Sequence, residues 1–161
     1  MTRNTAREIA IHMVFSLSFD NVNADELLER QLTKERFAEL MTDMPLYTQF
    51  PNEKQEQYIR RLVKGVFEHG PELDDYISRY AVGWSFARIP RMAAAIMRTA
   101  MYEVLYMPDV PNAAAINSAV ELAKHYEPKE VVSYLNGILG TFVRTECPEE
   151  SASAATDSTE G

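Results

Sequence analysis

Side chains that commonly carry chemistry are few in this sequence, and their spacing matches no catalytic or metal-binding motif. The three histidines, His12, His69 and His125, show neither the HExxH pattern nor a His/Cys spacing that fits a metal ion. No serine, nor the single Cys147, lies in a recognisable nucleophile motif, and a glycine-rich phosphate loop is absent from the sequence. We therefore expect that the protein is not an enzyme and that it uses no metal and no cofactor.

Two other groups of residues are suited to binding. Arg3 and Arg7 are spaced one helical turn apart and face the same side, where such side chains either are solvated or hold an anion. Tyr80 lies near Trp84 and Arg88 at a predicted helix end, where its ring either packs inside or stacks on a base. The residues alone leave both alternatives open.

Composition limits how a nucleic acid can be bound. The 161 residues are 46% hydrophobic, which is enough for the core of one domain or of two small subdomains. Of the net charge of −8, five negative charges follow Arg144 in a segment without Lys or Arg, which leaves −3 for the rest. This balance excludes a generally basic nucleic-acid-binding protein. Any RNA site must therefore be a local patch.

Cysteine content and hydropathy favour the cytoplasm. One cysteine cannot form an internal disulfide, and no apolar run is long enough for a signal peptide or a membrane span. We expect a cytoplasmic protein that has no contact with a membrane.

The N-terminal part of the sequence predicts several helices. A helix over residues 3–19 has a broad apolar face, with Phe19 in the core. Asn23 caps a second helix, and Thr33 restarts the helical pattern. These signals predict helical packing from the first residues onward.

A surface loop and a longer helix follow. Prolines and polar residues predict a surface loop over residues 45–52. The helix over residues 53–69 directs Phe67 inward, and Gly70 and Pro71 end it at a junction between two subdomains.

The C-terminal part predicts a helix at the centre of a bundle. The segment 91–107 is apolar nearly all round, so it belongs in the middle of a helical core. Arg98 within it would need a carboxylate partner, which Glu103 or Glu121 can supply.

The remaining two helices pack around that central one. The helix that begins near Asn112 is predicted to use this residue as its cap and to bury one face: Ile116, Ala119, Val120, Ala123 and Tyr126. In the last helix, which opens at Pro128, the pair Asn136-Gly137 is predicted to let neighbouring helices approach closely.

Together these elements predict an all-α fold, a helical bundle of two small subdomains packed together. The subdomains are expected over residues 1–70 and 71–146, followed by a disordered acidic tail over residues 147–161. We expect a chain ended near Arg144 to keep its stability, because the segment beyond it lacks apolar anchors.

Several separated motifs occur in one order along the chain: YIRRLVKG, ELDDYI, IMRTAMYE, DVP, INSAVELAK and YLNGIL. In this order and spacing the sequence resembles the NusB family, well over residues 58–142 and more loosely over residues 3–15. The resemblance implies an all-helical protein that joins a NusE-type ribosomal protein to bind boxA-like single-stranded RNA of ribosomal RNA operons. It also implies action with the transcription elongation complex in transcription antitermination, by a monomer or a homodimer.

The resemblance also implies site residues. Phe15 would face the protein partner, and the family's arginine-rich start corresponds to Arg3 and Arg7, although Asn4 and Thr5 stand where the family is often basic. The residues implied to bind RNA are Arg3, Asn4, Arg7, Tyr80, Lys129, Glu130 and Tyr134.

Two alternatives remain open at this point. The chain would be an accessory domain of a ribosomal RNA methyltransferase if it belonged with a methyl-donor-binding domain, but nothing after Arg144 resembles one. Sparse basic residues and the acidic tail also fit a helical protein-interaction module with little RNA binding.

Overall fold

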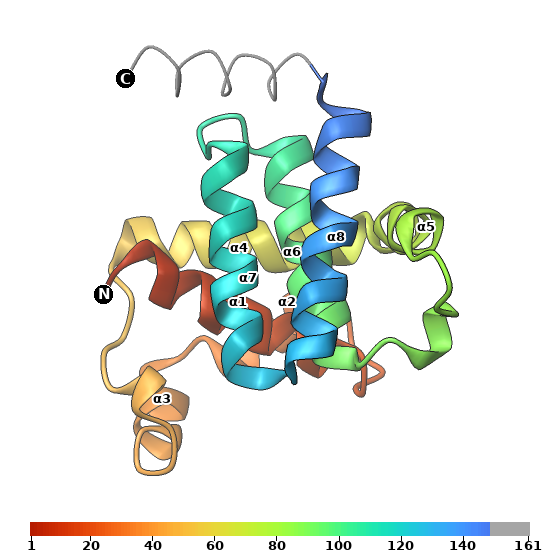
Figure 1. Ribbon diagram of the computed structural model, residues 1–161. Helices are drawn as coiled ribbons and strands as arrows, with labels where there is room; N and C mark the ends of the chain where they lie inside the picture. Colours follow the sequence, from red (N-terminus) through yellow and green to blue (C-terminus); the bar gives the residue numbers. More distant parts are fainter. Residues whose placement is uncertain (149–161) are drawn as a thin grey trace. The chain divides into compact units, whose positions relative to one another are not determined.

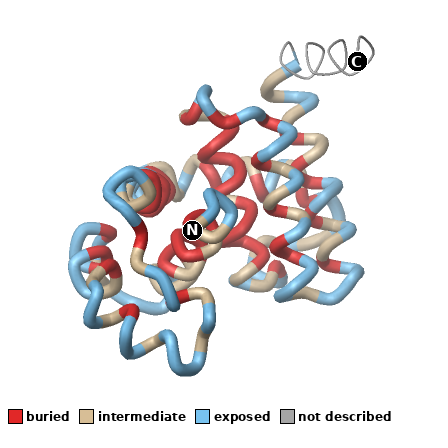
Figure 2. Tube along the Cα trace, turned by 90° about the vertical axis from the view of Figure 1, so that its left-hand side faces the viewer, coloured by how far each residue is buried: buried red, intermediate tan, exposed pale blue. Residues whose placement is uncertain are grey.

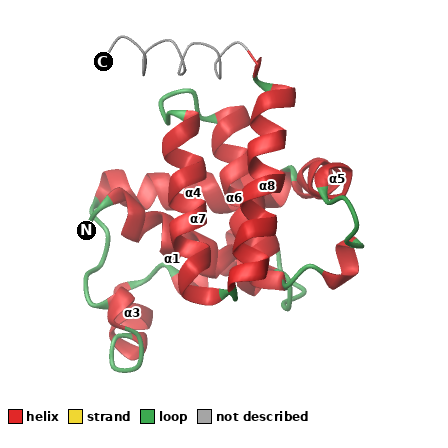
Figure 3. Cartoon of the chain, in the orientation of Figure 1, coloured by secondary structure: helices red, strands yellow, loops and turns green. Residues whose placement is uncertain are grey.

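The computed structural model describes residues 1–148, and every regular element within that range is helical (Figures 1 and 3). The all-α prediction is confirmed. The chain divides into two compact units, the N-terminal unit Met1–His69 and the C-terminal unit from Gly70 onward. Residues 149–161, which make up most of the predicted acidic tail, lie outside the described residues.

In the N-terminal unit, the longest two helices pack against each other and a third contacts both. The elements are α1 (Arg3–Leu17), α2 (Ala24–Gln31), α3 (Lys34–Leu40), the 3-10 helix η1 (Pro45–Tyr47) and α4 (Glu53–Glu68). Helix α1 packs along α4, and α2 contacts α1 and α4. Aliphatic side chains with no exposed surface form the core between them: Ile9, Leu27, Leu28, Ile59 and Leu62. Burial alternates with exposure along each helix, as amphipathic packing requires (Figure 2).

Side-chain caps fix where these short helices begin. As predicted, Asn23 Oδ1 accepts a hydrogen bond from the first turn of α2 at 2.9 Å, and Thr33 Oγ1 does the same for α3 at 3.1 Å. Asn52 forms a reciprocal capping box with Gln55 at the start of α4. Each such cap contributes about 1 kcal/mol, which matters most for helices of one or two turns.

The prediction of a surface loop over residues 45–52 is wrong in part, because Tyr47 and Pro51 within it are buried. Tyr47 is 5% exposed and packs edge-on against Phe37, with ring centroids 5.0 Å apart. Its hydroxyl lies 3.1 Å from Nδ1 of His12 on α1. Pro51 is also buried. The segment is therefore attached to the helical core of its unit.

Two aromatic residues predicted to face inward are exposed. Phe19 is 59% exposed, because α1 ends at Leu17 and the chain leaves the helical stripe before reaching it. Phe67 is 46% exposed in the last turn of α4, where Val66 takes the inward position instead.

The C-terminal unit is built around α6, as its all-round apolar sequence predicted. Its elements are α5 (Gly70–Tyr80), the 3-10 helix η2 (Phe86–Arg88), α6 (Arg91–Tyr106), α7 (Asn112–Tyr126) and α8 (Lys129–Glu146). Helix α6 contacts α5, α7 and α8, and most of its residues are buried. The surrounding helices therefore share one core.

The predicted partners of Arg98 are wrong. Its Nε donates to Oδ1 of Asp74 on α5 at 2.5 Å, because α5 packs alongside α6. Glu121 instead accepts from Lys124 one turn later on α7. The pair between Arg98 and Asp74 ties α5 to the central helix.

The predicted buried face of α7 is confirmed at Ala119 and Ala123 but is displaced by about one residue elsewhere. Ile116 and Val120 are only half-buried, and Tyr126 is 37% exposed. Asn112 is not the cap but the first helical residue, because Pro111 occupies the cap position. The residues that α7 buries are Asn112, Ala115, Ala119, Leu122 and Ala123.

Within residues 1–148 no helix has the length and apolar character needed to cross a membrane.

Candidate functional site

The predicted N-terminal residues form a compact cationic cluster, defined here as Arg3, Asn4, Arg7 and Tyr58. The guanidinium carbon of Arg3 lies 4.8 Å from the centroid of the Tyr58 ring, and that of Arg7 lies 6.0 Å from it. Arg7 Nη1 donates to Asn4 Oδ1 at 2.7 Å. Cation–π contacts of this kind fix the direction in which a guanidinium points.

The two arginines differ in their exposure to solvent. Arg7 is 4% exposed, whereas Arg3 is exposed to solvent. An anion that approaches the cluster therefore meets Arg3 first, while Arg7 mainly holds Asn4 and the Tyr58 ring in place.

A shallow hollow of about 220 Å³ borders the cationic cluster. Lys54, at the start of α4, adds a second cationic side chain to its lining. Gln55 Nε2 donates to the Met1 carbonyl at 2.5 Å, which ties the first residue of the chain to the same place. Neither Tyr58 nor Lys54 could be recognised as a site residue from the sequence, because no local pattern pairs α1 with residues about fifty positions away.

The C-terminal unit contains a larger hollow of about 470 Å³ beside α8, here named the aromatic hollow. Three of the predicted residues, Tyr80, Glu130 and Tyr134, line it. Lys129 is exposed in the first turn of α8 and does not line it. The complete lining is Tyr80, Val82, Trp84, Glu130, Ser133, Tyr134, Gly137, Ile138 and Thr141.

Stacked rings form one side of the aromatic hollow. The rings of Trp84 and Tyr134 lie 4.5 Å apart at an angle of 25°, and Tyr134 Oη donates to the Val82 carbonyl at 3.2 Å. Gly83 makes this possible, because its φ of 86° lies in the left-handed region and turns the chain between Val82 and Trp84. From the sequence, Trp84 was recognisable only as a neighbour of Tyr80.

Gly137 gives the hollow an open floor rather than a helix contact. A Cβ placed on Gly137 would meet nothing within 4 Å, so the predicted close approach of helices at Asn136-Gly137 is wrong. Without a side chain at this position, the surface of α8 stays open between Tyr134 and Thr141.

The aromatic hollow offers rings and hydroxyl groups rather than positive charge. Glu130 is the charged residue in its lining. Burial raises the pKa of the Tyr134 hydroxyl, and burial followed by the nearby Glu146 raises that of Tyr80. Both hydroxyls therefore stay protonated at neutral pH. Such a surface can stack on a planar, uncharged group and hydrogen-bond to its edge.

Phe15, the predicted contact for a protein partner, is half-buried at the end of α1. It packs edge-on against the exposed Phe19, with ring centroids 4.9 Å apart. The two rings together make a small apolar surface on the N-terminal unit.

Metal chemistry finds no support in the described part of the chain. Within residues 1–148, no three His, Cys, Asp or Glu side chains come together in a group that could hold a metal ion.

Comparisons with known proteins agree with one another. The NusB family model matches residues 4–144, which include the aromatic hollow and all of the cationic cluster except Arg3. The transcription antitermination protein NusB of Carboxydothermus hydrogenoformans is 40% identical over 87% of this chain and 91% of its own length. The same protein of Acetivibrio thermocellus is 36% identical over 91% of each chain.

Solved structures share the fold. NusB of T. maritima superposes with a TM-score of 0.74 at 26% identity, over 89% of this chain and 92% of that chain. A crystal structure of the antitermination factors NusB and NusE in complex with dsRNA matches with a TM-score of 0.70. It covers 89% of this chain and 96% of that chain, and its 19% identity supports the fold alone. Because the family model spans nearly the whole described chain and a relative is 40% identical over 87% of it, this chain belongs to the NusB family.

Proposed function

We propose that this protein is an RNA-binding transcription antitermination factor that binds boxA-like RNA of ribosomal RNA operons together with a NusE-type ribosomal protein. The observation that carries the proposal is the match to the NusB family over residues 4–144, because its relatives are antitermination proteins that this chain matches over about nine-tenths of their length. The role goes with a cytoplasmic location and with contacts to the transcription elongation complex. It requires no catalysis by this chain.

The two sites suit different parts of a single strand. Phosphates are bound by cations, and Arg3 with Lys54 supplies them in the N-terminal unit. Unstacked bases are bound by aromatic faces and hydroxyl groups, which the aromatic hollow supplies. We assign the phosphate contacts to the cationic cluster and at least one base to the aromatic hollow.

The Phe15–Phe19 pair is the proposed contact for the NusE-type protein. An aromatic pair that combines a half-buried ring, Phe15, with an exposed ring, Phe19, is suited to the centre of a protein interface. A partner bound there would add its own RNA contacts and raise the effective concentration of the strand.

Titration of labelled boxA RNA into this protein, with and without the NusE-type partner, tests the proposal. We expect weak binding by the chain alone and much tighter binding by the pair, with a shuffled RNA of equal length as control. Partner binding without any preference for boxA over the shuffled RNA would favour the protein-interaction module instead.

A further inference from the structure

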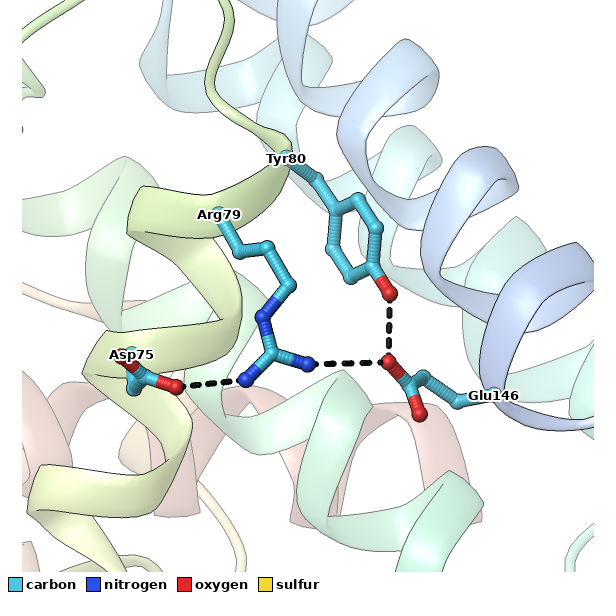
Figure 4. Close-up of polar contacts among 4 residues, drawn as sticks. All are labelled: Asp75, Arg79, Tyr80 and Glu146. Atoms are coloured by element: carbon cyan, nitrogen blue, oxygen red, sulfur yellow. Dashed lines mark hydrogen bonds and ion pairs between the residues drawn. The ribbon is translucent and has the colours of Figure 1, made fainter.

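The hydroxyl end of Tyr80 is held by the last turn of α8 (Figure 4). Tyr80 Oη donates to Oε1 of Glu146. The same oxygen accepts from Arg79 Nη1 at 3.2 Å, while Arg79 Nη2 donates to Asp75 Oδ2 at 2.7 Å. Glu146 is mostly buried, with 23% of its side chain exposed. One carboxylate thus joins the end of α5 to the end of α8.

The other parts of the Tyr80 side chain are also constrained. Its ring packs edge-on against Phe142 of α8, with centroids 6.3 Å apart and an angle of 66°. The ring also lines the aromatic hollow. Tyr80 is the last residue of α5, where a side chain without anchors would be free to turn toward solvent. The hydrogen bond and the Phe142 contact together leave the ring one orientation.

We propose that Glu146 is a positioning residue for RNA binding, which holds the Tyr80 ring in place beside the aromatic hollow before a base arrives. The inference rests on the proposed function, since it assumes that a base occupies the hollow. A ring that is already ordered loses less conformational entropy when the base stacks on it, so binding is tighter than with a mobile ring.

Because Glu146 is negatively charged, a positioning role and simple electrostatic repulsion of RNA have opposite consequences when its carboxylate is removed. Removal of a carboxylate near a polyanion should by itself strengthen binding, because it removes repulsion. Loss of a positioning contact should weaken binding. The two explanations therefore predict opposite signs for Glu146→Ala.

Affinity for labelled boxA RNA, measured with the partner present, provides the test. Tyr80→Ala should weaken binding about 5- to 100-fold, the range for one stacked base. Glu146→Ala and Tyr80→Phe should each weaken it about 3- to 10-fold, the range for one hydrogen bond. The double variant Tyr80→Phe/Glu146→Ala should bind RNA no more weakly than the weaker of its two single variants, because both substitutions remove the same hydrogen bond. Glu146→Gln keeps an acceptor oxygen, so its RNA affinity should stay within about 2-fold of that of the wild type.

Glu72 offers a matched control in the same unit. Its carboxylate accepts from the Tyr106 hydroxyl at 2.7 Å, a contact of the same kind, but neither residue lines the aromatic hollow. Glu72→Ala removes one negative charge and one Tyr–Glu hydrogen bond, so we expect unchanged or slightly tighter RNA binding. Melting temperatures of all variants separate a loss of folding from a loss of binding.

If Tyr80→Ala weakens binding while Glu146→Ala leaves it equal or tighter, the inference is overturned and the proposed function stands. Additive losses for Tyr80→Phe and Glu146→Ala would also overturn it. If Tyr80→Ala has no effect, the aromatic hollow is not an RNA site and the proposed function fails there.

Shortened chains give a second test and revise the predicted tail. Glu146 is the last residue of α8 and has partners on α5, so ending the chain near Arg144 removes contacts that the sequence did not reveal, and we now expect a cost. A chain ended after Pro148 should keep RNA affinity, and one ended after Arg144 should lose about as much as Glu146→Ala. Equal affinity of the two shortened chains would overturn the inference.

Discussion

The cationic cluster of the N-terminal unit and the aromatic hollow of the C-terminal unit differ in nearly every physical property. In the first, Arg3 and Lys54 surround a small hollow and the Tyr58 ring supports the guanidinium groups. In the second, Trp84 and Tyr134 stack beside an open floor, and the charged residue is an acid. Phosphate contacts position a nucleic acid, whereas base contacts specify it. Under the proposed function, the cationic cluster would therefore supply RNA affinity that depends on salt, and the aromatic hollow would supply affinity that depends on base sequence.

The largest expected effect concerns the buried side of α8, the helix that carries Tyr134 of the aromatic hollow. Leu135 is 1% exposed and directly follows Tyr134 on α8, so the two side chains face different surroundings. Leu135→Ala should lower the free energy of unfolding by about 2–5 kcal/mol through lost burial and a cavity. Denaturant unfolding measures the loss. A cost below about 1 kcal/mol would mean that α8 is not packed as described.

The next effect concerns binding itself. Tyr134→Ala removes one ring of the stack and should weaken RNA binding, with the partner present, by about 1–3 kcal/mol. Tyr134→Phe is the matched control, since it keeps the ring and loses only the hydrogen bond to Val82. Equal losses for the two variants would show that the hydroxyl, and not ring stacking, matters here.

A smaller effect distinguishes the two arginines. Because Arg3 is exposed, Arg3→Ala should lose one phosphate contact. The resulting loss of RNA affinity should be about 5-fold larger at 0.1 M salt than at 1 M salt. Arg7 is buried and bonded to Asn4, so Arg7→Ala should lower thermal stability more than Arg3→Ala does. Partner affinity without RNA should be unchanged for Arg3→Ala. The reverse pattern would make Arg7 the phosphate contact.

The smallest effect concerns pH and the N-terminal unit. Burial lowers the pKa of His12, against a weaker opposing effect of Glu8, so the folded state disfavours the charged ring. The unfolded chain then binds more protons below about pH 6.5, and stability falls as the pH drops from there toward the lowered folded pKa. The slope from this residue is at most about 1.4 kcal/mol per pH unit. Denaturant unfolding of wild type and His12→Gln at pH 7.5 and 5.5 measures it. The same pH response in both proteins would exclude His12 as the cause.

The sequence predicted the parts of this molecule that depend on local signals. The caps at Asn23 and Thr33 and the central position of the helix over residues 91–107 needed only residues near one another. The phase of α7 was predicted wrongly because apolar residues lie on both sides of its buried stripe, so a shift of one residue preserves the pattern. Ile116→Ala should therefore cost less than the 2–5 kcal/mol typical of a fully buried site.

The candidate sites were harder to predict because they depend on contacts between distant residues. Nothing near Arg3 indicates that Tyr58 will support it, and Gln55 was not distinguished from other polar helix residues. The glycine at position 83 was the available local sign of a turn before Trp84, since glycine adopts the left-handed conformation at no steric cost. The contact between Glu146 and Tyr80 joins residues 66 positions apart.

The salt dependence of RNA affinity tests the division between the two sites most directly. Affinity for boxA RNA, with the partner present, is measured over a range of salt concentrations for wild type, Arg3→Ala and Tyr134→Ala. If the cationic cluster binds phosphate and the aromatic hollow binds a base, Arg3→Ala reduces the slope of log affinity against log salt by about 0.7. Tyr134→Ala lowers affinity at every salt concentration without changing the slope. An unchanged slope for Arg3→Ala, or a reduced slope for Tyr134→Ala, would contradict this account.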